Sequence, residues 1–488
     1  MFVPGLPGSN LLDAATGERI FLDLPESFLD PLRDRLKGPD DLSDMSVVAG
    51  APVGSFSLPF PLSLLASLFM DLKQSESLYE ILRPLYPPGE FSRWSVRFGW
   101  DWRRPIWDGP MLERLANEIT ALSVEHQQPV VMLVHSTGGL VLRYLLEHYF
   151  VADVPDPARR AQLIARIGRI ISLGVPWAGT LKTLKAFTAQ EGLGALVSPD
   201  KAQEILGRSW AAFDLAPPDP ASAPAGVEYP ELLVNEVGQS SPLADRRWMP
   251  DRPAIPKSAM ELRSDASTAH IGARTPEPDF GGIPVTNVAG WGYKTTVGAE
   301  LIPGAAPASV VFEDRVDTSG FDDGDGTIPS RSAAWLEGSG VTTLHQPIGI
   351  RGAGPISVQK HITLWNNEAC RNALRYLIAG VSANQEFVTA VVDWRERTDP
   401  LSKVHVRCAA NGFDGSLLED AHVRFRRPSL SDEPRFQLAH GGRMLLEIDR
   451  SAIPISTSGT FRVLELEIRW RKGGVVQSSD PFRFFLTP

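Results

Sequence analysis

The 488-residue sequence predicts an α/β fold built on a parallel sheet, followed by an antiparallel β-domain. Up to about residue 380, short apolar runs such as Val130–Val134 and Ile170–Leu173 alternate with amphipathic helical patterns, which is typical of a parallel sheet covered on both faces. Beyond about residue 382, apolar and charged residues alternate singly, as in Leu464–Arg471, which indicates strands with one solvent-exposed face. We therefore expect an α/β domain over residues 1–380 and a β-sandwich over residues 385–488.

The elements of the first domain follow from these local patterns. Trp94–Phe98 reads as a strand, and Met111–Ser123 places apolar residues on one helical face. Val285–Gly290 is a further expected strand. A helix from about Ile362 to Ala379 is expected to stop at Gly380, because glycine readily adopts the left-handed conformation that ends helices.

Between about residues 181 and 284 the periodicity breaks down. Nine prolines fall between positions 217 and 256, and the segment is too long for a simple connection. We expect this segment to form an irregular cap, or lid, over the site.

Composition excludes some classes of function. A formal net charge of −10 argues against nucleic-acid binding, which recruits clustered Lys and Arg. The two cysteines, Cys370 and Cys408, fall in helical and strand patterns and are expected to be buried core residues. No signal-peptide pattern is present, which favours a cytoplasmic location, although Met1–Val3 reads as the end of a strand and leaves open a start further upstream.

The candidate nucleophile is Ser136, which directly follows the apolar run and precedes a helical pattern. A serine hydroxyl attacks esters only with a base, a carboxylate that orients the base, and donors for the oxyanion. Gly138 and Gly139 allow a sharp turn here. This is the nucleophile-elbow arrangement of α/β-hydrolases, with Val134 replacing the first glycine of G-x-S-x-G. The alternative is a strand-to-helix turn that an ordinary serine caps.

Backbone N–H groups are expected to form the oxyanion hole. One belongs to Thr137, directly after the nucleophile. The other belongs to Leu6, in the Gly-rich turn that follows Phe2–Val3. His135 is expected to shape the elbow rather than to accept the serine proton.

The acid and the base come from later loops. Asp325, in the acidic loop Asp322–Pro329, is the expected acid; Asp323 is an alternative, and a solvated acidic turn is the other interpretation. His361 directly precedes a helical pattern and is the expected base, whereas His345 ends a strand-like run and is the alternative. The order serine, aspartate, histidine is that of α/β-hydrolases.

Taken together, these motifs resemble those of the lecithin:cholesterol acyltransferase family, which includes phospholipid:diacylglycerol acyltransferases and lysosomal phospholipases. The five matching blocks, which span about residues 1–380, are Val3–Leu6, Trp100–Arg103, His135–Gly139, Ser172–Gly179 and Gly324–Thr327. The resemblance implies the catalytic residues named above and places Trp100 and Trp177 at the substrate pocket. The cysteines that hold the lids of secreted relatives are absent, and the β-domain has no family counterpart that we recognise.

The sequence thus predicts a serine-dependent acyl-ester enzyme that acts on lipid or other hydrophobic esters, with no metal or organic cofactor. Water as the acceptor makes it a lipase or esterase, and an alcohol makes it an O-acyltransferase. Phe56–Met70 is too short to span a bilayer and is expected either to contact a membrane surface or to pack under the cap. The alternative is a catalytically silent scaffold whose C-terminal domain binds a protein partner or a glycan.

Overall fold

The computed structural model describes residues 1–6, 8–17, 47–52, 74–188, 190, 199, 203, 206, 209–217, 275–301, 310–315, 323–349, 361–380, 386–392, 403–426 and 442–488. The segment Phe56–Met70 and most of the expected cap lie outside these residues, and so does the loop that precedes His361. No helix in the described ranges is long and apolar enough to cross a membrane.

A parallel five-stranded sheet forms the centre of the first domain, as predicted. Its strand order is β1-β4-β5-β6-β9. The strands are β1 (Phe2–Val3), β4 (Val130–His135), β5 (Ile167–Leu173), β6 (Val285–Trp291) and β9 (Val341–Pro347). Because all five strands run in one direction, the residues that follow them meet at the same edge of the sheet.

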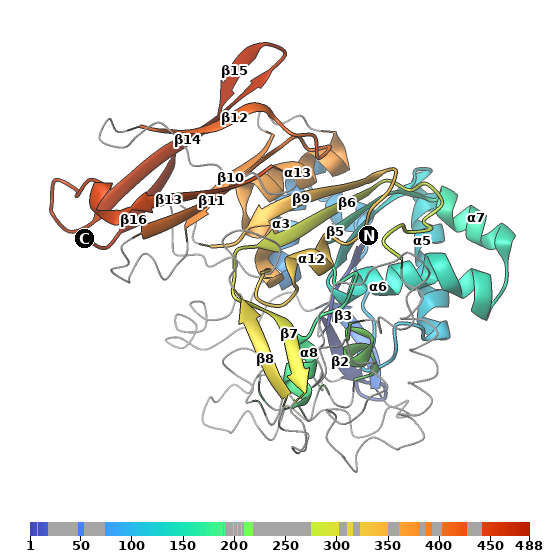
Figure 1. Ribbon diagram of the computed structural model, residues 1–488. Coiled ribbons are helices and arrows are strands. Elements are labelled where there is room, and N and C mark those ends of the chain that lie inside the picture. The colour runs from blue at the N-terminus through green and yellow to red at the C-terminus, as the bar shows by residue number, and fades with distance from the viewer. Residues whose placement is uncertain are drawn as a thin grey trace.

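Alternate residues of the strands face two different apolar cores. Met132 and Val134 of β4 belong to one core, and Leu133 belongs to the other. The first core contains α5 (Gly109–His126), α6 (Thr137–Tyr144), the π-helix Leu145–Asp153 and α7 (Pro157–Ala165). The second contains α3 (Gln74–Leu82), α4 (Phe91–Trp94) and α13 (Glu368–Ala379). Helices therefore cover both faces of the sheet (Figure 1).

The chain after residue 386 forms two antiparallel sheets that pack on each other, as the alternating pattern predicts. One sheet has the order β10-β11-β13; in the other, β14 pairs with β12, β15 and β16. The strands are β10 (Phe387–Val392), β11 (Lys403–Asn411), β12 (Glu419–Phe425), β13 (Arg443–Asp449), β14 (Arg462–Lys472), β15 (Val475–Ser478) and β16 (Phe482–Leu486). Apolar residues from both sheets form one core. The boundaries at 380 and 385 stay predictions.

Several local predictions differ from the structure. Trp94–Phe98 is not a strand: α4 extends through Trp94, and only Arg97 makes a single bridge to Phe2. The expected helix after His361 is divided into the 3-10 helix η6 (His361–Asn366) and α13, and it ends at Gly380 with φ 65°, as predicted. Two antiparallel pairs of strands, β2–β3 and the hairpin β7–β8, have no clear sequence signal. Their strands are Ser9–Asp13 and Val47–Pro52, and Thr295–Leu301 and Val310–Arg315.

The described parts of the expected cap pack beside the hairpin β7–β8. They include α8 (Lys182–Phe187) and α10 (Trp210–Asp214), and their apolar side chains form one cluster with Ala299 of β7. Leu6 and Phe312 pack against this cluster. In Figure 1, α8 lies next to β7. The lid function of the whole segment stays a prediction.

Both cysteines are free and buried, as expected for core residues. Burial raises the pKa of the Cys370 thiol to about 12 and raises the pKa of the Cys408 thiol further. Neither thiol is therefore reactive near neutral pH.

Candidate active site

Ser136 lies in a strained turn between β4 and α6. Its φ is 51° and its ψ is −130°, a conformation that residues other than glycine rarely adopt. Its backbone N–H donates to the carbonyl of Leu173 at the end of β5, 3.1 Å away. Because strain of this kind persists only where the surrounding structure enforces it, the turn has the character of a functional elbow rather than an ordinary helix cap.

The elbow depends on two close approaches of backbone. A Cβ atom on Gly138 would lie within 2.4 Å of the Val3 carbonyl oxygen and 2.6 Å of the Pro4 carbonyl oxygen. A Cβ atom on Gly5 would lie 2.4 Å from Ser136 Cβ and 3.0 Å from Ser136 Oγ. The start of α6 and the loop after β1 therefore pack directly on each other, and the Ser136 hydroxyl lies next to Gly5 of that loop.

The two residues predicted to supply the oxyanion donors belong to these two segments. Thr137 is the first residue of α6, and the first N–H groups of a helix lack partners within it and lie at its positive end. Leu6 directly follows Gly5, and the N–H of Gly8 donates to the Gly5 carbonyl to close a tight turn. The arrangement suits the stabilisation of a negative oxygen next to Ser136.

Asp325 and His361 form a buried pair. Nδ1 of His361 and Oδ2 of Asp325 are 2.7 Å apart, and both side chains are almost wholly shielded from solvent. The other carboxylate oxygen, Oδ1, accepts hydrogen bonds from the N–H groups of Thr327 and Ile328 at 3.0 and 2.7 Å. A carboxylate only accepts, so Nδ1 carries a proton, and in the neutral imidazole Nε2 then has a free lone pair. This is the tautomer that general-base catalysis requires.

Two contacts place the His361 ring beside the elbow. The ring packs on Gly174, the residue after the carbonyl that accepts from Ser136. On the other side, Nε2 of His135, the residue before Ser136, lies 3.2 Å from the carbonyl oxygen of His361, and the two imidazole rings are 4.7 Å apart. Nε2 of His361 has no hydrogen-bond partner among the described residues. The His361 ring therefore contacts the neighbours of Ser136 and Leu173, but its Nε2 and the Ser136 hydroxyl do not form a hydrogen bond with each other.

The role expected for His135 fits its contacts. The His361 carbonyl only accepts, so Nε2 of His135 donates to it and fixes the backbone that carries the base. Burial, and next the charge of His361, hold the pKa of His135 well below its usual range. His135 is therefore a neutral donor at physiological pH.

A pH-dependent stability follows. Unfolding lets His135 take up a proton near pH 6.5. The contribution of the neutral, buried His135 to the free energy of unfolding is therefore fully present above that pH. It is lost as the pH falls below 6.5, by up to about 1.4 kcal/mol per pH unit. We expect His135→Gln to flatten this dependence in urea unfolding between pH 5 and 8. The exposed His422→Gln is the control. Equal slopes for wild type and His135→Gln would contradict the assignment.

The alternative acid and base lie elsewhere. Oδ2 of Asp323 accepts from the N–H of Gly292 at 2.7 Å, and its carboxylate faces Arg443 of the β-domain. His345 lies within the edge strand β9 opposite Ala289, three strands away from β4. The geometry therefore favours Asp325 and His361.

The two tryptophans expected at the substrate pocket are anchored beside the site. Nε1–H of Trp100 donates to the Pro4 carbonyl at 2.9 Å, so the fully buried indole supports the oxyanion loop. Nε1–H of Trp177 donates to Oδ1 of Asn287 at 3.1 Å. Contact with substrate stays a prediction for both.

Asn287 is a residue that the sequence reasoning missed. Its Oδ1 also accepts from the hydroxyl of Ser172, so one buried amide ties the end of β5 and the loop to Trp177 onto β6. The asparagine in the middle of the expected strand Val285–Gly290, where a buried amide needs hydrogen-bond partners, is the signal that could have identified it.

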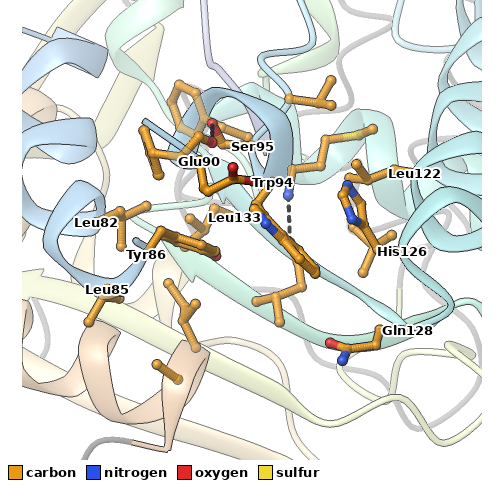
Figure 2. A pocket seen from close by; sticks show the side chains of 18 of the residues that line it. Leu82, Leu85, Tyr86, Glu90, Trp94, Ser95, Leu122, His126, Gln128 and Leu133 are labelled. Atoms are coloured by element: carbon orange, nitrogen blue, oxygen red, sulfur yellow. Dashed lines mark hydrogen bonds between the residues drawn. The ribbon is translucent and has the colours of Figure 1, made fainter. Parts of the chain in front are cut away.

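A cavity of about 560 Å³ lies at the opposite end of the sheet from Ser136. It opens at the start of β4, where Val130 and Val131 line it, and the rings of Trp94 and His126 stack at 4.0 Å on one wall. Figure 2 shows these two rings next to each other. The cavity is therefore separate from the candidate catalytic residues.

Residues 93–222 match the family model described as lecithin:cholesterol acyltransferase. This part of the chain is similar to the lecithin:cholesterol acyltransferase family. This finding confirms the resemblance that the motifs predict. The matched residues include the elbow, the Trp100–Arg103 block and Trp177. Leu6, Asp325 and His361 lie outside them, so their assignment depends on the motifs and on the geometry.

Among curated proteins, lysosomal phospholipases are similar to part of the chain. Lysosomal phospholipase A and acyltransferase of Rattus norvegicus is 29% identical over 117 residues, which are 23% of this chain and 26% of that protein. The protein of the same name from Bos taurus is 33% identical over 91 residues, 18% of this chain and 20% of that protein. The chain thus spans about a quarter of the length of the curated relatives it matches.

Solved structures show similarity over larger parts of the chain at lower identity. A chain of the Tle4–Tli4 complex is 15% identical, with a TM-score of 0.47, covering 78% of this chain and 97% of that chain. The mature form of Bacillus licheniformis lipase BlEst2 is 12% identical, with a TM-score of 0.24, covering 54% of this chain and 69% of that chain.

Proposed function

We propose that the protein is a serine-dependent acyl-ester enzyme that acts on lipid or other hydrophobic esters. The observation that carries the proposal is the buried Asp325–His361 pair held beside the strained elbow of Ser136. The match of residues 93–222 to the lecithin:cholesterol acyltransferase model and the similarity to lysosomal phospholipase A and acyltransferase support the same class of reaction.

In the proposed reaction, Ser136 Oγ attacks the ester carbonyl while Nε2 of His361 accepts its proton. Asp325 holds the imidazole by accepting from Nδ1–H and stabilises the imidazolium that forms. The N–H groups of Leu6 and Thr137 stabilise the oxyanion. His361 then returns the proton to the leaving alcohol, and an acyl-enzyme remains.

The second half of the reaction decides the type of enzyme. Water that attacks the acyl-enzyme releases a free acid, and an alcohol forms a new ester. In both cases His361 takes the proton of the attacking group, and the Ser136 hydroxyl is restored. No described group of three or more His, Cys, Asp or Glu side chains could hold a metal ion, and the proposed steps use only side chains and backbone of this chain.

Product analysis tests this proposal. Wild-type protein is incubated with phospholipid and triacylglycerol, with and without a long-chain alcohol, and the products are identified by mass spectrometry. We expect free acid or new ester to form, and Ser136→Ala to lower the rate by a factor on the order of 10⁴ or more. The control is Ser458→Ala, an exposed serine of the β-domain. Equal rates for Ser136→Ala and wild type would contradict the proposal.

Contact with a membrane surface through Phe56–Met70 is a further part of the proposal, because a lipid substrate favours exposure of an apolar segment. Flotation with phosphatidylcholine vesicles tests it. We expect the wild-type protein to float with the vesicles, and the variant with Phe60 and Phe69 replaced by serine to stay in the free fraction. A wild-type protein that also stays in the free fraction would contradict membrane contact.

A further inference from the structure

A buried arginine of the β-domain lies at the base of the loop that carries Asp325. Arg443 is the first residue of β13 and is 2% exposed. Its Nη2 lies 3.7 Å from Oδ1 of Asp323, two residues before Asp325. Its guanidinium carbon lies 3.9 Å from the ring centroid of Trp291, the last residue of β6. One side chain of the second domain thus contacts both the acidic loop and the strand beside it.

Backbone and side-chain hydrogen bonds connect Asp323, which faces Arg443, to Asp325 and His361. Asp323 accepts from the N–H of Gly292 through Oδ2, and its carbonyl accepts from the N–H of Ser330 at 2.6 Å. Gly324 exchanges two backbone hydrogen bonds with Tyr293. The backbone carbonyl of Asp325 accepts from the N–H of His361 at 3.1 Å. A displacement at Asp323 therefore moves the acid and the base together.

The β-domain also contacts the segment that carries the base. Asn367 caps α13 directly after η6, and its Oδ1 accepts from the N–H of Ala369. Its Nδ2 donates to Oγ1 of Thr389 in β10 at 2.8 Å, and both side chains are buried. The helix that begins at His361 is thus fixed at its far end by the second domain.

The two domains share an apolar core, so these polar contacts lie within a packed interface between the domains. Phe387, Ala409 and Phe413 of the β-domain lie in the same cluster as Leu344 and Trp365 of the first domain. Figure 1 shows β10 and β11 next to α13 and β9. A domain docked in this way holds a fixed position relative to the sheet.

We propose that the C-terminal β-domain positions the Asp325–His361 pair, with Arg443 as the positioning residue. The inference depends on the proposed function, since it assigns the domain a role in the same reaction. Removal of the guanidinium leaves the buried Asp323 carboxylate without this counter-charge. The loop then relaxes, and a shift of about 1 Å in a catalytic group lowers the rate by about 100-fold.

The test compares Arg443→Met, Arg443→Lys and Thr389→Val with Arg471→Met, which removes an arginine of the same domain that is 56% exposed. Thermal unfolding gives the stability of each variant, and kcat and KM are measured on a short water-soluble ester below the lowest Tm. We expect Arg443→Met to lower kcat by about 10- to 100-fold with KM within about 3-fold of wild type. Arg443→Lys should recover part of kcat, and Arg471→Met should equal wild type.

Thr389→Val keeps the inference testable if Arg443→Met does not fold, because the change is nearly isosteric and removes only the contact on the histidine side. We expect it to lower kcat by about 5-fold. A folded Arg443→Met with wild-type kcat, or with a raised KM alone, would overturn the inference and leave the proposed function intact. Wild-type protein that neither turns over esters nor reacts with a fluorophosphonate removes the proposed function, and the inference with it.

Discussion

Asp325→Asn is expected to lower kcat by a factor on the order of 10⁴ while the protein stays folded. The reason is the orientation that the loop imposes on the amide. The N–H groups of Thr327 and Ile328 both donate to Oδ1, so the amide oxygen must occupy that position. The NH₂ group then replaces Oδ2 and donates to Nδ1 of His361, 2.7 Å away. The imidazole is forced into the tautomer with Nε2 protonated, which cannot accept the proton of Ser136.

The measurement is the steady-state rate on a soluble ester, together with a urea unfolding curve for each protein. Asp420→Asn is the matched control, because Asp420 is exposed and its φ of 49° is one that asparagine also tolerates. An Asp325→Asn variant that retains more than about a tenth of wild-type kcat would show that Asp325 does not orient the base.

Gly138→Ala is expected to damage the elbow. The added Cβ would meet the carbonyl oxygens of Val3 and Pro4, and backbone atoms cannot move aside as flexible side chains do. We expect a loss of about 1–3 kcal/mol in the free energy of unfolding. Since the same backbone holds Thr137 and Ser136, a fall of about 100-fold in kcat should accompany it.

Gly109→Ala serves as the control, because it lies in α5 and its Cβ would meet only Tyr149, at the ordinary contact distance of 3.8 Å. That change should leave kcat unchanged and alter stability by less than about 1 kcal/mol. If the two variants were equally stable and equally active, the close approach at Gly138 would have no consequence for the elbow.

Much of the architecture could be predicted from local patterns. The apolar run Val130–Val134 and the glycines after Ser136 indicate β4 and the turn to α6, because a buried parallel strand and a close backbone approach each leave a clear local signal. The order serine, aspartate, histidine fits Asp323 and His345 as well as Asp325 and His361. The position of His361 directly before a helical pattern favours it as the base, and the structure joins it to Asp325 by a 2.7 Å hydrogen bond. The alternation in Leu464–Arg471 likewise predicts β14.

The remaining features depend on contacts between distant parts of the chain. Arg443 and Asp323 are separated by 120 positions, and an arginine in an alternating strand gives no indication that it will be buried against another domain. The run Trp94–Phe98 reads as a strand, but Trp94 ends the helix α4, where its ring lies near Tyr86 and stacks on His126. In both cases tertiary packing decides between interpretations that the local pattern allows.

The most direct test of the proposed mechanism is the site of reaction with a fluorophosphonate, a reagent that forms a covalent bond only with an activated serine. Intact mass should show one adduct per chain, and peptide mapping should place it on Ser136. Asp325→Asn should react far more slowly, and Ser136→Ala should not react. An adduct on another residue, or equal labelling of wild type and Ser136→Ala, would contradict the account.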